Sequence, residues 1–268
     1  MAVRVPFGDR YLAGRSAIHD ADARVKLPAA LAYIFAVTLT PVGHWPALGL
    51  LALPPAAALA ASRLSPVVVL RRSALALPFL LAAVPLMFTR EGEALFSVPF
   101  FGWTASREGL EAVLSILAKS WLSVTAAVIL TATTPAAELL RAMRALGLPR
   151  LLVATVSFMY RYLFVIGEEA LRLVRARDSR SARPAGVCLP GRKAGGSLRW
   201  RAKVLGNMVG SLFLRTYERS ERVYAAMQAR GYDGEPRFLR NRPWRAIDVM
   251  LAIALVAYLA GVEVYARY

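Results

Sequence analysis

The chain has 268 residues, of which 57% are hydrophobic, and its 34 Lys and Arg against 17 Asp and Glu give a net charge of +17. A chain this apolar and this basic is typical of an integral membrane protein with basic loops on one side. A basic nucleic-acid-binding protein would not carry several long uncharged apolar runs, so we expect no nucleic-acid partner. The single cysteine, Cys188, excludes an internal disulfide and a multi-cysteine metal site.

Five apolar runs are candidate transmembrane helices, because a spanning helix needs about 20 mostly apolar residues. In chain order they are 27–43, 45–62, 73–88, 112–134 and 246–266. The second is broken by Pro54-Pro55, and the third also contains prolines, which neighbouring helices must accommodate. Lys119 interrupts the fourth run near its start, and Asp248 and Glu263 lie near the ends of the fifth. The pattern predicts an all-α polytopic membrane protein with about five transmembrane helices.

The short loops orient these spans, because cytoplasmic loops carry an excess of Lys and Arg. The segment before Lys26, the 63–72 connection and the stretch after Thr134 are basic, whereas the 41–46 connection has no Lys or Arg. We therefore expect a cytoplasmic N-terminus and an external C-terminus. We also expect the membrane to be a bacterial inner (cytoplasmic) membrane. The predicted sections are 1–134 (N-terminal segment and first four spans), 135–245 (cytoplasmic-side insert) and 246–268 (last span and C-terminus).

The insert contains an apolar run, 151–170, that resembles a span but carries Arg161 at its centre, where a charge is costly. Both flanks are basic, and one crossing cannot join two cytoplasmic flanks. We expect this run to stay on the cytoplasmic side, in the interface or under the bundle. After the Gly-, Pro- and Ser-rich loop 179–197, a second amphipathic helix completes a hairpin of two long helices. One face of that second helix is predicted to carry Leu205, Val209, Leu212, Thr216, Val223 and Met227.

Each predicted long helix ends near a short arginine triplet, Ala176-Arg177-Asp178 in the first and Ala229-Arg230-Gly231 in the second. One interpretation is structural, because an arginine in the last turn complements the helix dipole and a following glycine supplies a left-handed stop. This explains the second triplet well and the first poorly, since aspartate favours the opposite helix end. The other interpretation is docking, in which a guanidinium flanked by small residues enters a groove and binds a carboxylate at two points.

Other site chemistry is poorly supported by the residues. His19 and His44 fall on opposite sides of the membrane in this topology, and no Cys, His or Asp cluster accompanies either, so we expect no metal site. No phosphate-binding glycine motif is present, and Ser123, Ser211 and Ser220 lack a convincing His and Asp partner. We therefore expect a chain that is not an enzyme. The remaining basic residues are expected to contact anionic membrane lipids.

Four stretches carry a resemblance to a known family: SAIHDADARVKL (16–27), TTPAAELLRAMRALGLP (133–149), FMYRYLFVIGEEALRLVRARDSR (158–180) and AAMQARGYDG (225–234). Together they resemble the T component of energy-coupling factor (ECF) transporters, the CbiQ-type coupling subunit of vitamin and transition-metal importers. The match runs almost end to end. The three-residue motifs are weak individually, but their order on this topology is fairly specific.

The resemblance implies that the two long helices are coupling helices whose arginines dock on a pair of ABC-type ATPases. It assigns that role to Arg177 and Arg230, framed by Ala176, Asp178, Ala229 and Gly231. At the last position of the first triplet, the family more often has a small residue than an aspartate. Asp178 would pair with Arg175, Arg180 or a basic residue of the ATPase. ATP and Mg would be bound by the ATPase subunits, with no cofactor in this chain.

The same resemblance implies a second partner, a small membrane-embedded substrate-binding subunit. Its platform would be formed by Phe158, Tyr162, Met208, Leu212 and Phe213, for which contacts between the two helices are the alternative interpretation. Glu168 and Glu169 either order the start of the first arginine-rich segment or are simply solvated. The type of match points to cobalt import, with nickel or a vitamin as alternatives, since no residue of this chain selects a metal. The rival hypotheses are an intramembrane enzyme, for which polar pairs inside the spans are almost absent, and a stand-alone membrane scaffold.

Overall fold

The structure is a computed structural model that describes residues 11–12, 14, 16–74, 83–85, 87, 94–98, 103–181, 197–234 and 246–268. The chain divides into two compact units. One unit, the helix pair, contains α9 (Arg150–Ser181) and α10 (Leu198–Ala229). The other, the bundle unit, contains all remaining elements, including α8 (Ala136–Ala145), the first helix of the predicted insert, which packs on α2.

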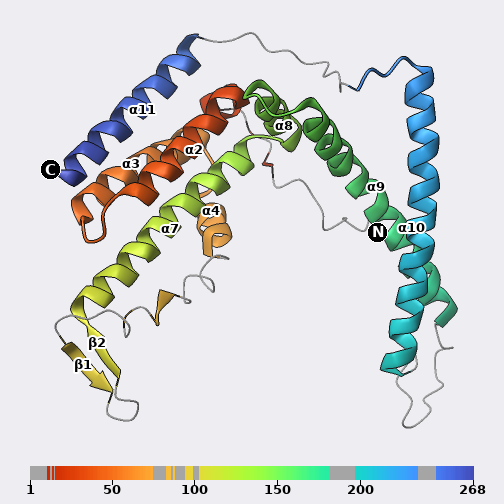
Figure 1. The fold of residues 1–268 in the computed structure, drawn as a ribbon, viewed down its shortest axis with the longest axis horizontal. Coiled ribbons are helices and arrows are strands. Elements are labelled where there is room, and N and C mark those ends of the chain that lie inside the picture. Colours follow the sequence, from red (N-terminus) through yellow and green to blue (C-terminus); the bar gives the residue numbers. More distant parts are fainter. Residues whose placement is uncertain are drawn as a thin grey trace. The chain divides into compact units, whose positions relative to one another are not determined.

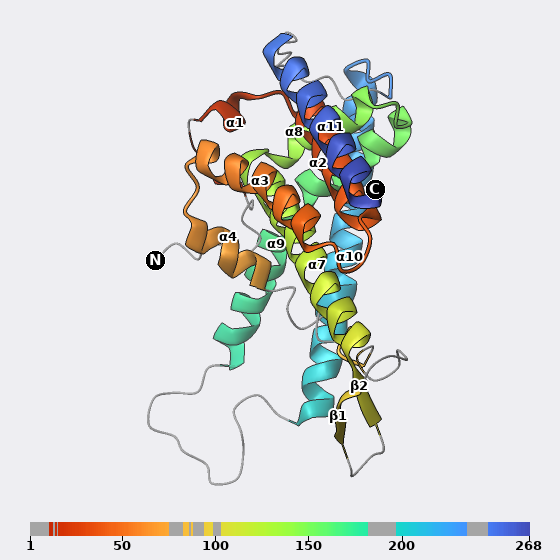
Figure 2. The same cartoon turned by 90° about the vertical axis from the view of Figure 1, so that its left-hand side faces the viewer.

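Four long helices form the bundle unit: α2 (Ala23–Leu39), α3 (Trp45–Ser62), α7 (Arg107–Thr133) and α11 (Ala246–Arg267). Helix α11 packs on α2 and α3, and both α2 and α3 pack on α7 (Figure 1). Two short helices flank them, α1 (Ala17–Asp20) beside α3 and α4 (Pro66–Ser73) beside α7 (Figure 2). The core is made by side chains of α2, α3 and α11, namely Tyr33, Ala36, Val37, Ala47, Leu51, Leu259, Val262 and Ala266.

The prolines of α3 lie inside a helix that continues to Ser62, so the expectation that Pro54-Pro55 breaks this span is wrong. Proline has no N–H, so the carbonyls four residues earlier, those of Leu50 and Leu51, lose their helical donors. Two tyrosine hydroxyls from neighbouring helices replace them. The hydroxyl of Tyr33 in α2 donates to the Leu51 carbonyl at 2.8 Å, and that of Tyr258 in α11 donates to the Leu50 carbonyl at 2.9 Å. The neighbours therefore accommodate the prolines by hydrogen bonding, as the membrane environment requires.

A polar cluster joins α2, α7 and α11 at the end of α2. The Lys119 ammonium of α7 donates to the Thr40 carbonyl, and the Thr40 hydroxyl donates to Glu263 of α11 at 2.9 Å. Arg267, one turn further along α11, lies 3.8 Å from the other oxygen of Glu263. In the sequence, Lys119 and Glu263 are separate interruptions of two apolar runs. The fold brings both side chains into contact with Thr40, which reduces the free-energy cost of placing their charges inside the bundle.

The described residues include two short strands, β1 (Ala94–Val98) and β2 (Trp103–Ser106), which pair antiparallel in one hairpin. Helix α7 begins directly after β2, where the Ser106 hydroxyl accepts a hydrogen bond from the Gly109 amide at 3.0 Å. Apart from this hairpin, the described regular structure is helical, and the all-α membrane fold class is confirmed.

Four helices of the described segments are long and apolar enough to cross a membrane: α3, α7, α9 and α11. Three of them match predicted spans 45–62, 112–134 and 246–266. Predicted span 27–43 corresponds to α2, which begins and ends four residues earlier. Most of predicted span 73–88 lies outside the described residues. Helix α9 meets the same length and composition criteria, while its placement on the cytoplasmic side stays a prediction.

Replacing either tyrosine that donates a hydrogen bond to a carbonyl of α3 should destabilise the bundle. Tyr33→Phe or Tyr258→Phe leaves a carbonyl in the middle of α3 without its donor, at a cost of about 1–2 kcal/mol. Thermal unfolding of the purified full chain in mild detergent should show a lower Tm for each variant. Tyr265→Phe is the control, because Tyr265 is exposed.

A second substitution separates the lost hydrogen bond from a general packing defect. Pro55→Ala restores an N–H that can reach the Leu51 carbonyl, so it should recover part of the stability lost in Tyr33→Phe. Equal destabilisation by Pro55→Ala in both backgrounds would contradict the role of Tyr33 as a replacement donor.

Candidate functional site

The second arginine triplet lies where α10 ends, in a hydrogen-bonded stop. The Gly231 amide donates to the Gln228 carbonyl at 2.9 Å, and the Tyr232 amide donates to the Met227 carbonyl at 3.0 Å. Gly231 has a φ of +77°, the left-handed conformation that this type of ending requires. The structural interpretation of Gly231 is therefore confirmed. It leaves Arg230 exposed at the helix end, and the described residues offer it no ion pair.

The first triplet lies in the last turns of α9, with three more helical residues after Asp178. A partner of Asp178 is the adjacent Arg177, which is not among the arginines predicted from the sequence, Arg175 and Arg180. One carboxylate oxygen of Asp178 accepts hydrogen bonds from Arg177 Nη2 at 2.6 Å and from Arg177 Nε at 3.0 Å. The side chain of Arg177 is 35% exposed and that of Asp178 is 56% exposed. The two triplets therefore differ, because one arginine is paired with its own neighbour and the other is not.

Helices α9 and α10 run antiparallel, which places the triplets at opposite ends of the pair. Glu169 contacts Arg215 near the middle, and Phe158 near the start of α9 packs edge-on against Tyr232, after the end of α10, with ring centroids 6.0 Å apart. The contact between Glu169 and Arg215 is a common reference point for the two helices. At a rise of about 1.5 Å per residue, Arg177 lies about 12 Å along α9 from this contact, and Arg230 lies about 22 Å along α10 from it in the opposite direction.

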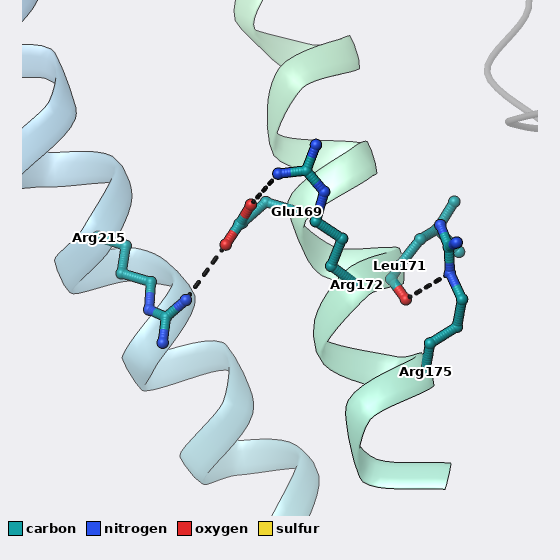
Figure 3. A network of polar contacts seen from close by, with 5 residues as sticks. All are labelled: Glu169, Leu171, Arg172, Arg175 and Arg215. Atoms are coloured by element: carbon teal, nitrogen blue, oxygen red, sulfur yellow. Dashed lines mark hydrogen bonds and ion pairs between the residues drawn. The ribbon is translucent and has the colours of Figure 1, made fainter. Parts of the chain in front are cut away.

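An ionic network joins the two helices where they meet (Figure 3). The Glu169 carboxylate lies between two guanidinium groups, 3.2 Å from Arg172 of the same helix and 3.2 Å from Arg215 of α10. The side chain of Glu169 is 23% exposed, whereas Glu168 is an exposed residue. Glu169 therefore orders the start of the arginine-rich segment and also links the helices. The cross-helix half of this role had no signal in the sequence, since 46 residues separate the partners.

A groove of about 590 Å³ lies between α9 and α10 and contains two of the five predicted platform residues, Phe158 and Tyr162. Met208 and Leu212 are half-buried on α10. Phe213 is 66% exposed and stacks on Tyr217 of the same helix. The five predicted platform residues therefore lie in three different environments: two line the groove, two are half-buried on α10 and one is exposed.

The predicted apolar face of α10 is correct only in its second half. Leu212, Thr216, Val223 and Met227 are half-buried, whereas Leu205 and Val209 are exposed. No residue of α10 is fully buried. Large apolar side chains of the pair are therefore exposed, and they include Leu151, Leu152, Met159, Leu163, Leu198, Val209, Phe213 and Leu214.

Metal-binding chemistry finds little support in the segments that the structure describes, where no group of three His, Cys, Asp or Glu side chains comes together. His19 is buried and hydrogen-bonded through both ring nitrogens, to the Ser16 hydroxyl at 2.7 Å and to the Leu12 carbonyl at 3.1 Å. His44 is exposed at the start of α3. Cys188 lies outside the described residues.

The Glu169 network yields a test of helix pairing. Glu169→Gln removes the charge from two ion pairs, each worth about 0.2–1 kcal/mol when exposed, and should loosen the contact between α9 and α10. Spin labels at the exposed positions Leu163 and Leu214, in a Cys188→Ser background, should report a broader distance distribution. Glu168→Gln is the matched control and should leave the distribution unchanged. Equal widths in both variants would show that packing alone sets the helix pair.

Comparison of the sequence with known proteins shows the family of the chain. The model of the family CbiQ, described as cobalt transport protein, matches residues 14–240. The energy-coupling factor transporter transmembrane protein EcfT of Exiguobacterium sibiricum is 31% identical over 69% of this chain and 69% of its own length. An uncharacterized protein of Methanocaldococcus jannaschii is 29% identical over 60% of this chain, and the alignment spans only 56% of that protein.

A third relative differs in its name and length. A protein of Bifidobacterium longum, provisionally named an ABC transporter ATP-binding protein, is 28% identical over 92% of this chain but only 32% of its own length. The matched family is a transmembrane transporter component and not a catalytic subunit. The chain belongs to the CbiQ family of multi-pass membrane proteins, which includes the T components of energy-coupling factor transporters.

Proposed function

We propose that this chain is the transmembrane coupling subunit of an ATP-driven importer of the energy-coupling factor type, with cobalt as the transported ion. The observation that carries the proposal is the helix pair, in which two arginine triplets lie at opposite ends of α9 and α10 in a member of the CbiQ family. Two docking points on two crossing helices can convert relative motion of two ATPase subunits into a change of the angle between the helices.

The proposed contacts with the ABC-type ATPases are made by Arg177 and Arg230. An arginine offers a planar fork of donors that can bind a carboxylate at two points. Ala176 and Ala229 keep the flanks narrow, and Gly231 ends α10 directly after its arginine. The Bifidobacterium longum relative also supports this proposal, because a protein named for ATP binding contains a region similar to almost the whole of this chain. ATP and Mg would be bound by those partner subunits.

The proposed second partner is a small membrane-embedded substrate-binding subunit. The exposed apolar side chains of α9 and α10 support this proposal, since large apolar side chains that no helix of the pair covers can contact a partner. Phe213 and the groove residues Phe158 and Tyr162 would belong to that surface. Met208 and Leu212 would support it from the half-buried positions between the helices.

Cobalt follows from the description of the matching family, and nickel or a vitamin is the alternative cargo. Selection of the cargo would lie with the substrate-binding partner. We propose a bacterial inner membrane as the location of the chain. The distribution of Lys and Arg among its short loops supports a cytoplasmic N-terminus. The other basic residues would contact anionic lipid at that surface.

Charge reversal at both arginines tests the docking role. In Arg177→Glu/Arg230→Glu, a docking carboxylate would meet a like charge, so the tagged chain should lose its co-purifying ABC-type ATPase in mild detergent. Uptake of radioactive cobalt should fall to background. Membrane insertion and the Tm of the purified chain should not change, because both positions are outside the core. A variant that retains its ATPase and still supports uptake would favour the stand-alone scaffold.

Maleimide labelling tests the proposed orientation. The native Cys188 lies in a loop predicted to be cytoplasmic, so a membrane-impermeant maleimide should label it only after permeabilisation. His44→Cys in a Cys188→Ser background places the thiol at the exposed start of α3, predicted to be external, and should be labelled in intact cells. Labelling of Cys188 in intact cells would invert the proposed topology.

A further inference from the structure

The two docking points are chemically unequal. At the first, both donors on one side of the Arg177 guanidinium, Nε and Nη2, are bound to a single oxygen of Asp178 at 3.0 and 2.6 Å. That side is one of those through which an arginine binds a carboxylate in a two-point fork. The pair carries no net charge. At the second, Arg230 carries its full positive charge at an exposed helix end, with no ion pair among the residues described.

Asp178 is not explained by the stability of its helix. It lies in the last turns of α9, where the helix dipole disfavours a negative charge. Adjacent residues on a helix do not face each other, so the contact with Arg177 requires the arginine side chain to fold back along the helix. Asp178 thus restrains the Arg177 guanidinium through two hydrogen bonds.

We infer that Asp178 is an internal competitor for the first docking site, occupying the Arg177 fork until a carboxylate of the ATPase displaces it. This inference rests on the proposed docking function. On this inference, Arg230 makes the stronger contact with the ATPase and keeps it throughout the transport cycle. Arg177 makes the weaker contact, which forms and breaks during the cycle. Two identical ATPase subunits would therefore be held with different strengths at the two ends of the helix pair.

The size of the effect follows from the exposure of the pair. An ion pair between solvent-exposed side chains contributes about 0.2–1 kcal/mol, which corresponds to a change of about 1.4- to 5-fold in affinity. This range is large enough to order the two contacts and small enough for an ATPase carboxylate to overcome. The competitor weakens docking at Arg177 without abolishing it.

The test measures the affinity of the full-length chain in mild detergent for the ABC-type ATPase that co-purifies with it, after the two are separated and recombined. Asp178→Asn keeps the shape of the side chain and removes its charge. We expect the Kd to fall by about 1.4- to 5-fold. Glu221→Gln is the control, because it removes the same charge from an exposed position of α10, about 14 Å along the helix from Arg230 and beyond the screening length.

A second background separates competition from a general charge effect. The Arg177→Ala variant has no guanidinium for Asp178 to bind, so adding Asp178→Asn to it should leave the Kd unchanged. The inference is overturned if Asp178→Asn weakens binding, has no effect in the native background, or strengthens binding equally in both backgrounds. Weaker binding would mean that Asp178 itself contacts the ATPase.

Failure of the docking proposal gives a different result. If the ATPase binds Arg177→Glu/Arg230→Glu as tightly as the native chain, neither arginine docks and the competitor role falls with them. If that variant loses binding while Asp178→Asn behaves like Glu221→Gln, the docking function stands and only the competitor role is wrong. Elution as a single species with unchanged Tm confirms that each variant is folded.

Discussion

The bundle depends on one constraint, that no backbone carbonyl inside a membrane can remain without a donor. Pro54 and Pro55 remove two donors from the middle of α3, and the hydroxyls of Tyr33 and Tyr258 replace them. Because these tyrosines come from α2 and α11, satisfying α3 also positions the first and last long helices of the unit. The core residues Val37, Leu51 and Leu259 pack around the same junction. Hydrogen bonding and apolar packing therefore select the same arrangement.

The helix pair is built on a different balance. Its described contacts are an aromatic edge contact between Phe158 and Tyr232, the ion pairs of Glu169, and half-buried side chains, with no fully buried residue on α10. Such a contact is adjustable, because exposed ion pairs are weak and little apolar area is removed from water. The proposed coupling role needs this property, since the helix pair would change its geometry in response to its partners while the bundle keeps its own.

Much of the candidate site was predictable because it is local. Gly231 after a helical run predicts a left-handed ending, and the structure confirms it with a φ of +77°. The order of the two triplets on their helices also carried the family resemblance. The state of Arg177 was not predictable, because sequence spacing allowed Asp178 several arginine partners and the backbone geometry selects its neighbour. The link from Glu169 to Arg215 was equally hidden, since it depends on where two helices cross.

The sequence by itself determined the class of protein, the main spans, the long helix pair and the positions of its arginines, because hydropathy, loop charge and turn residues act over short distances along the chain. Only the tertiary structure decided which polar groups meet. It brought Lys119 and Glu263 to Thr40, gave the α3 prolines their tyrosines, and moved Leu205 and Val209 off the contact face of α10. The physical reason is that these pairings join residues tens to hundreds of positions apart, and each depends on a helix rotation and crossing that no local pattern specifies.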